Sequence, residues 1–214
     1  MQEKSKPVDN LRADAEKIIT RAIAAVLPDA ANAASEGIVN FTQTGIKAVQ
    51  PGVSSPKAYT TAEYCCRIAG MLAGMPLTRS STYFVLDDVL SITSSADADQ
   101  DVDDGKLILL YDGEKHKIAR GVTSLTGSNA IEDFKKIKMV EGADMIAGDI
   151  RRTFADNYVG QVVNDYDHKQ LLVANINRYL SSLEGTVLDS GYDNRAQVNL
   201  EAQRNYLMEQ GIDT

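Results

Sequence analysis

The stretch that most constrains the fold runs from residue 132 to 160 and reads EDFKKIKMVEGADMIAGDIRRTFADNYVG. Phe134, Lys136 and Lys138 alternate with their neighbours at a period of two, which is typical of a β-strand with different faces. From Val140 the apolar positions are spaced by three and four, as on one face of an amphipathic helix: Ala143, Ile146, Ala147, Ile150 and Phe154. Polar residues fall on the other side: Asp144, Asp149, Arg151, Arg152 and Asp156. The pattern predicts a strand leading into a two-faced helix, a framework element that indicates function through surfaces rather than catalysis.

The segments before this stretch predict strands and two helices. Residues 11–20 predict a helix after a polar lead-in, and residues 21–27 a short strand closed by Pro28. Strands are expected within 37–49, broken near Gly45, and again at 82–86. The sequence TTAE from Thr60 is a capping-box pattern that opens a helix over 61–74. An Asp-Gly pair at 112–113 predicts the turn of a hairpin within 107–122.

The segments after it are helical. A cap at Asn164 or Asp165 opens a helix to about Glu184, with Leu172, Ile176, Tyr179 and Leu183 on one face. A turn-rich linker over 185–197 precedes a last helix, 200–210, which Gly211 ends. This order of elements predicts an α+β fold, a mixed β-sheet packed with several amphipathic helices. We expect residues 1–20 to form a lead-in and first helix, and residues 21–214 one globular domain.

The net charge and the length of the apolar stretches indicate which classes of partner are unfavourable for this chain. The formal net charge is −8, which disfavours nucleic acid because binding to phosphates requires a basic surface. The apolar stretches fall far short of the roughly 18 residues that a membrane span needs, and the N-terminus lacks the apolar core of a signal peptide. The two cysteines, Cys65 and Cys66, are adjacent and cannot easily bridge, so a reducing interior such as cytoplasm is expected.

No group of residues forms a recognisable chemical site. The acidic run from Asp97 to Asp104 lacks the glycine and glutamate of an EF-hand loop and predicts a solvated loop or helix start. His116 and His168 lack partners at metal-binding spacing. The cysteines are interpreted as small buried thiols in a helix interface. Phosphate-binding glycine motifs are absent from the sequence. We therefore predict no catalytic residue, no metal and no cofactor.

Several ordered blocks resemble contractile-tail sheath proteins, of the kind found in myophages and defective prophages of Gram-positive bacteria. These blocks are AEYCCRIAGMLAGMPLTRSSTY (62–83), LILLYDGEKHKIARGVTSL (107–125), the stretch 132–160, NDYDHKQLLVANINRYLSSLEGTVLDSG (164–191) and VNLEAQRNYLMEQGID (198–213). The resemblance implies a structural subunit that polymerises around a tail tube and contracts to drive the tube through the host envelope. Its implied partners are other sheath subunits in a helical polymer, the tail tube protein and the baseplate. Its implied location is the virion, and the host bacterial cytoplasm during assembly.

The chain is shorter than the sheath proteins it resembles. The resemblance implies terminal arms that add strands to neighbouring subunits, and we expect this chain to be a core and C-terminal region without them. Contraction is expected to need interfaces with two packings rather than an active site.

Basic positions in this acidic chain suggest where a partner binds. We hypothesise that Lys135, Lys136, Lys138, Arg151 and Arg152 help to contact an acidic tube surface or another subunit. The alternative for these residues is an ordinary solvated surface. For the whole chain, the alternatives are a cytoplasmic α/β enzyme with a site assembled from scattered residues, and an interaction module that does not polymerise.

Overall fold

The computed structural model describes residues 26–211 except 31–33, 51, 54 and 128–129. The chain divides into two compact units, residues 1–143 and 144–214, which are described separately below. The α+β fold class is confirmed, with the strands distributed over three small sheets in the first unit. One globular domain over residues 21–214 stays a prediction.

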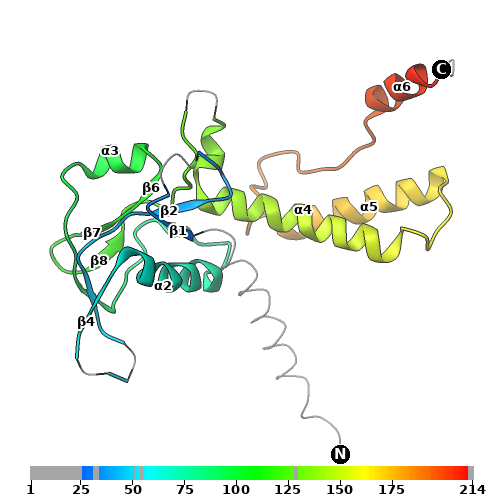
Figure 1. Cartoon of the computed structure of the whole chain (residues 1–214). Helices are drawn as coiled ribbons and strands as arrows, with labels where there is room; N and C mark the ends of the chain where they lie inside the picture. Colours follow the sequence, from blue (N-terminus) through cyan, green and yellow to red (C-terminus); the bar gives the residue numbers. More distant parts are fainter. Residues whose placement is uncertain (1–25, 31–33, 51, 54, 128–129, 212–214) are drawn as a thin grey trace, which may run out of the picture. The chain divides into compact units, whose positions relative to one another are not determined.

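The first unit carries the described strands (Figure 1). In one sheet β2 (Val39–Phe41) lies between β1 (Val26–Pro28) and β6 (Lys106–Leu107), all parallel. In the second, β3 (Ile46–Ala48) pairs antiparallel with β4 (Lys57–Tyr59) and β5 (Val89–Ser91). The third is the hairpin of β7 (Leu109–Tyr111) and β8 (His116–Ile118), which confirms the hairpin predicted at Asp112-Gly113.

The core of the first unit forms between these strands and helix α2 (Thr61–Gly74). Phe41, Ile46, Ile68, Leu107 and Ile118 are fully buried. The predicted capping box is present, because the Thr60 hydroxyl accepts from the Glu63 N–H while the Glu63 carboxylate accepts from the Thr60 N–H. These apolar side chains, spread along the sequence, are brought together by the sheets and by α2.

Two residues fix the turn between β2 and β3. The buried Gln43 side chain donates to the Thr93 carbonyl at 2.7 Å and accepts from the Leu109 N–H at 2.9 Å. Gly45 has a φ of 67°, and a Cβ there would lie 2.1 Å from the Thr93 hydroxyl. The predicted break near Gly45 is confirmed, since only a glycine fits this left-handed turn against Thr93.

The strand predicted at the start of the 132–160 stretch is wrong. Residues Glu132–Lys135 form a 3-10 helix, and helix α4 begins at Ile137 rather than Val140. Ion pairs at i,i+3 spacing, Glu132 with Lys135 and Asp133 with Lys136, join side chains along this turn. Among the described residues, the strand-like pairing of this segment is a single bridge between Lys136 and Val122. The alternating sequence pattern was therefore outweighed by these local interactions.

The strand predicted at 82–86 is also wrong. The segment begins as a turn in which Tyr83 has a φ of 57°, and Val85 forms a single bridge to Lys117. The segment still lies along β8, because the Tyr83 N–H donates to the Ile118 carbonyl and the Leu86 N–H to the His116 carbonyl. Its apolar residues are used to cover the core rather than to extend a sheet.

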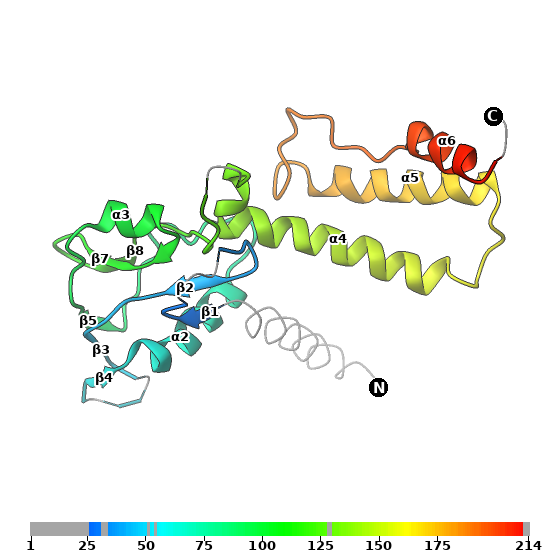
Figure 2. The ribbon, with the colours of Figure 1, turned by 45° about the horizontal axis from the view of Figure 1, so that its top comes forward.

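The second unit is helical. It holds most of α4 (Ile137–Asn157), together with α5 (Tyr166–Leu183) and α6 (Leu200–Glu209). Asp165 caps α5 through the His168 N–H at 2.8 Å, and Gly211 follows α6 with a φ of 72°. The helices, caps and linker predicted for this region are confirmed within a residue or two. Helices α4 and α5 lie side by side in both ribbon views (Figures 1 and 2).

Two expectations concern residues outside those that the structure describes. They are the helix over 11–20 and the first residues of the strand expected at 21–27, of which Val26–Pro28 are described as β1.

Candidate interaction surface

Two of the candidate lysines, Lys135 and Lys136, lie just before α4 and Lys138 lies in its first turn, and each contacts another residue of the first unit. Lys135 pairs with Glu132 at 2.6 Å and Lys136 with Asp133 at 3.0 Å. The Lys138 ammonium donates to the Thr78 carbonyl at 3.3 Å. The carboxylates offset the charge of Lys135 and Lys136, whereas the neutral carbonyl leaves Lys138 its positive charge.

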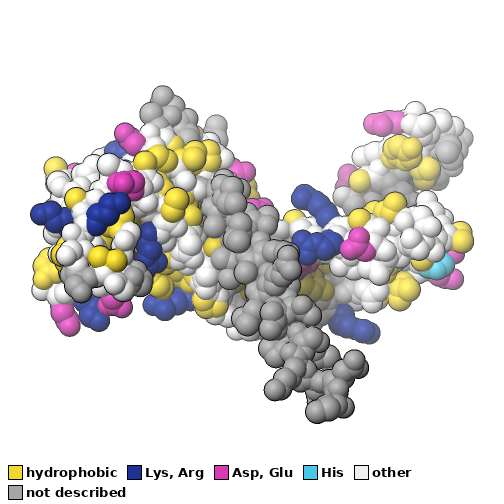
Figure 3. All heavy atoms as spheres, turned by 60° about the horizontal axis from the view of Figure 1, so that its bottom comes forward, with side chains coloured by type: hydrophobic (Ala, Val, Ile, Leu, Met, Phe, Trp, Pro, Cys, Tyr) yellow, Lys and Arg dark blue, Asp and Glu magenta, His cyan; other side chains and the backbone are white. Residues whose placement is uncertain are grey.

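The candidate arginines lie further along α4, in the second unit. Arg151 and Arg152 are exposed, and neither forms an ion pair within the part of the chain that the structure describes. The five candidates therefore fall into three lysines of the first unit, two of them paired with carboxylates, and two arginines of the second unit. In Figure 3, Lys and Arg side chains lie among acidic and hydrophobic ones rather than in one patch.

The polar face predicted for α4 is partly used inside the unit. The Tyr179 hydroxyl of α5 donates to the Asp149 carboxylate at 2.7 Å, so Asp149 faces α5 rather than an open surface. Burial, with this hydrogen bond, raises the pKa of Tyr179 to about 12. A second link joins the pair, since Asn175 donates to the Tyr158 hydroxyl at 3.0 Å. Asp144, Arg151, Arg152 and Asp156 are left as the exposed part of that face.

The acidic run forms a capped helix, as one of the two predicted outcomes. Asp97 caps α3 (Ala98–Asp103) by accepting from the Gln100 N–H. Lys106 binds Asp101 at 2.8 Å, and hydrogen bonds from Lys106 and Ser95 lower the pKa of Asp101. Among the described residues, no three His, Cys, Asp or Glu side chains gather in a way that could hold a metal ion.

The histidines and cysteines have structural partners. The ring of His116, on β8, lies 4.8 Å from that of Tyr111, and His168, in the first turn of α5, contacts the Asp165 carboxylate at 2.7 Å. Cys65 is buried, which raises the pKa of its thiol to about 11 and makes it a poor nucleophile. Cys66 is exposed, so the prediction of two buried thiols is wrong for this residue. Neighbouring residues on a helix point in different directions, which accounts for the difference.

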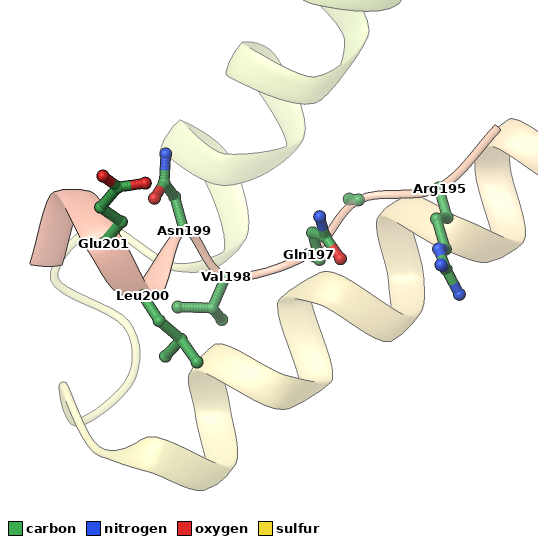
Figure 4. A pocket seen from close by; sticks show the side chains of 7 residues that line it. Arg195, Gln197, Val198, Asn199, Leu200 and Glu201 are labelled. Atoms are coloured by element: carbon green, nitrogen blue, oxygen red, sulfur yellow. The ribbon is translucent and has the colours of Figure 1, made fainter. Parts of the chain in front are cut away.

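A surface hollow lies beside the chain that leads into α6. Seven consecutive residues, 195–201, line it. Val198 and Leu200 point to one side of the chain and Asn199 and Glu201 to the other (Figure 4). A hollow made from one extended segment brings together no residues from distant parts of the sequence. It therefore offers contact area rather than a site for chemistry.

Sequence reasoning missed the uncovered apolar surface of the second unit. None of its described residues is buried, whereas several large apolar side chains are exposed: Phe154, Val159, Val163, Tyr166, Leu171, Leu200, Tyr206 and Met208. Periodicity identified the half-buried stripe of α5, but it does not show how much of that stripe a partner covers. The run VGQVV at 159–163, in a connection between two helices, was the available signal, because connections are usually polar.

None of the described helices is both long and apolar enough to span a bilayer.

The sequence of this chain is similar to those of known proteins. Residues 130–210 match the family described as phage tail sheath C-terminal domain. The tail sheath protein of Clostridium phage phiCD119 is 36% identical over 178 residues, covering 81% of this chain and 48% of that protein.

Solved structures share the fold. A sheath tail protein from Listeria innocua matches with a TM-score of 0.68 and 18% identity, over 94% of this chain and 49% of that one. A sheath tail protein from Desulfitobacterium hafniense matches with a TM-score of 0.63 and 19% identity, over 85% of this chain and 43% of that one. A chain of the anti-feeding prophage helical sheath, in its contracted state, matches with a TM-score of 0.55 and 12% identity, over 74% of this chain and 45% of that one. The chain spans just under half the length of these relatives.

The chain is therefore similar to tail sheath proteins, and its residues 130–210 match the family of phage tail sheath C-terminal domains. The resemblance found in the sequence is confirmed.

Proposed function

We propose that this chain forms part of a sheath subunit that surrounds a tail tube and contracts to drive the tube through a host envelope. The observation that carries the proposal is the continuous similarity to a tail sheath protein over 178 residues. The proposed partners are further sheath subunits, the tube protein and the baseplate. The anti-feeding prophage supports the first and last of these, because its contracted helical sheath and its baseplate both contain chains of this fold.

The proposed mechanism uses interfaces and no active site. A helical polymer is built from heterologous contacts, in which one surface of a subunit binds a different surface of the next. Contraction follows when these contacts have two packings of different free energy and switch in sequence along the tube. The proposed location is the virion, with assembly in the host bacterial cytoplasm.

The test is to express the gene that encodes this chain together with its neighbouring genes and to examine the product by electron microscopy. Sheaths with a helical repeat, surrounding a narrower tube, are the expected result. Discrete globular particles under conditions in which the tube protein polymerises would contradict the proposal.

The five basic residues are proposed to help bind an acidic tube or subunit surface. Arg151 and Arg152 support this better than the lysines do, because the lysines already contact Glu132, Asp133 and the Thr78 carbonyl. Charge reversal of the arginine pair should reduce co-sedimentation with the tube more than charge reversal of Lys135, Lys136 and Lys138. Lys47→Glu, at an exposed position on β3, is the control. Unchanged co-sedimentation of both sets would show that these residues are ordinary solvated side chains.

A further inference from the structure

Two exposed apolar clusters lie on different units of the chain. The first, here the tip, is the connection between α4 and α5 and contains Val159, Val162, Val163 and Tyr166. Val163 and Tyr166 are each 71% exposed. The second, here the entry cluster, precedes and opens α4 and contains Ile131, Phe134 and Met139, with Ile131 61% exposed.

The tip has a defined shape. Gly160 adopts a φ of 69°, and the N–H groups of Val159, Gln161 and Asp165 donate to carbonyls within the same connection or the end of α4. Asp165 then caps α5, and Asn175 holds the Tyr158 hydroxyl. A connection fixed by its own hydrogen bonds loses little conformational entropy when it binds, which favours a role as a docking element. Figure 2 shows this connection at the end of the α4–α5 pair.

Charge indicates what kind of partner the clusters fit. The chain carries a net charge of −8, so two copies repel each other except where they meet through neutral surface. Residues 157–164 contain no charged side chain, and the tip's one carboxylate is that of Asp165, between Val163 and Tyr166. At the entry cluster, Glu132 and Asp133 are each paired with a lysine, and Lys138, whose ammonium donates to the Thr78 carbonyl, keeps its positive charge. Each cluster is therefore mostly apolar, with one carboxylate on the tip and one ammonium of opposite charge on the entry cluster, so the tip of one copy can meet the entry cluster of another without like-charge repulsion.

The existence of two different clusters also fits an open polymer. A heterologous contact needs two complementary patches on one molecule, and a repeated contact of this kind produces a helix when it does not close. We propose that the tip of one chain packs against the entry cluster of a second copy. The proposal rests on the proposed sheath function, which supplies the helical polymer, and it names one of the surfaces that hold that polymer together.

The test uses two single variants of the 214-residue chain and their mixture. Val163→Asp disables the tip, and Ile131→Asp disables the entry cluster. Tyr192→Asp, at a side chain that is 75% exposed in the linker before α6, is the matched control. All three positions are highly exposed, so far-UV circular dichroism and the melting temperature should match those of the unmodified chain. Self-association is then measured by sedimentation velocity over a wide concentration range.

We expect the unmodified chain and Tyr192→Asp to self-associate equally, and each cluster variant to do so at least about tenfold more weakly. An equimolar mixture of Val163→Asp and Ile131→Asp should form a dimer and nothing larger, because one intact tip and one intact entry cluster are left. An unmodified chain that stays monomeric would overturn the proposal. So would normal association of Ile131→Asp alone, which would indicate tip-to-tip contact, or a mixture that fails to form the dimer.

The same variants in the sheath-forming expression separate this proposal from the proposed function. Sheaths of normal length from the Val163→Asp gene would overturn the tip contact and leave the sheath function standing. Absence of sheaths from the unmodified gene would count against the sheath function itself.

Discussion

The two units of this chain differ in what holds them together. The first unit has a core of fully buried side chains, drawn from β2, β3, α2, β6 and β8. The second has none among its described residues, and specific hydrogen bonds such as Tyr179 to Asp149 join its helices. The first unit is therefore stabilised mainly by its own apolar burial, while the second leaves apolar surface for contacts with other molecules.

The largest expected effect compares one residue type in the two units. Phe41→Ala, at a fully buried site, should lower the free energy of unfolding by about 3–5 kcal/mol. Phe154→Ala, at a side chain that is 45% exposed on α4, should lower it by about 1 kcal/mol or less. Urea denaturation of both variants measures the difference. Equal effects would show that the second unit is as tightly packed as the first.

Buried and accessible hydrogen bonds give the next comparison. Gln43→Ala leaves the buried Leu109 N–H without its acceptor and should cost about 1–3 kcal/mol for each unsatisfied group. Asn177→Ala in α5 removes two hydrogen bonds, both to the Ala196 backbone. It should cost only about 1 kcal/mol, since water can replace the amide at this partly exposed site. Denaturant midpoints of the two variants would test this order, and a larger loss for Asn177→Ala would reverse it.

Glycine substitutions should have opposite signs in the two units. Gly148 lies inside α4 with open space where a Cβ would be, so Gly148→Ala should stabilise the chain by about 1 kcal/mol. Gly45→Ala should destabilise it, because the turn requires a positive φ and the Cβ would meet Thr93. The melting temperature should rise in Gly148→Ala and fall in Gly45→Ala. A loss of stability in Gly148→Ala would show that this helix position has a packing or bending requirement.

The smallest expected effect depends on pH and concerns the cap of α5. Hydrogen bonds from the His168 backbone and ring lower the pKa of Asp165 below its usual value near 4. A lowered pKa in the folded state means that the ionised form stabilises the fold above pH ~4, and that this contribution is lost as the pH falls through the folded pKa. Asp165→Asn should therefore reduce stability slightly at pH 7, and the difference should disappear at low pH. A pH-independent difference would assign the effect to cap geometry alone.

Much of the second unit could be predicted from the sequence, because its signals are local. The Asp165 cap, the stripe of α5 and the terminal Gly211 each act within a few residues. The strands of the first unit could be predicted less well, because a short strand is defined by its pairing with a strand that is distant in the sequence. Residues 82–86 have strand-forming side chains but form a turn beside β8, and Phe134 to Lys138 alternate but begin a helix.

The candidate surface shows the same limit. The sequence identified the five basic residues but not their neighbours, and the structure places Glu132 and Asp133 beside two of the lysines. The exposed tip was overlooked because the exposure of an apolar side chain depends on what the rest of the chain leaves uncovered. Val163 and Ile176 are both β-branched apolar residues, yet the Val163 side chain is highly exposed and the Ile176 side chain is half-buried.

The bond between Gln43 and Leu109 has a consequence for how the chain is made. These residues are 66 positions apart, and β2 pairs with β6 across the same interval. Such distant pairing slows folding, since a long loop must close before the contact forms. During synthesis, β2 has no β6 to pair with until Leu107 has left the ribosome. Until then part of the Phe41 side chain lacks the apolar residues that bury it in the folded chain. We therefore expect the nascent chain to be most prone to aggregation at this stage.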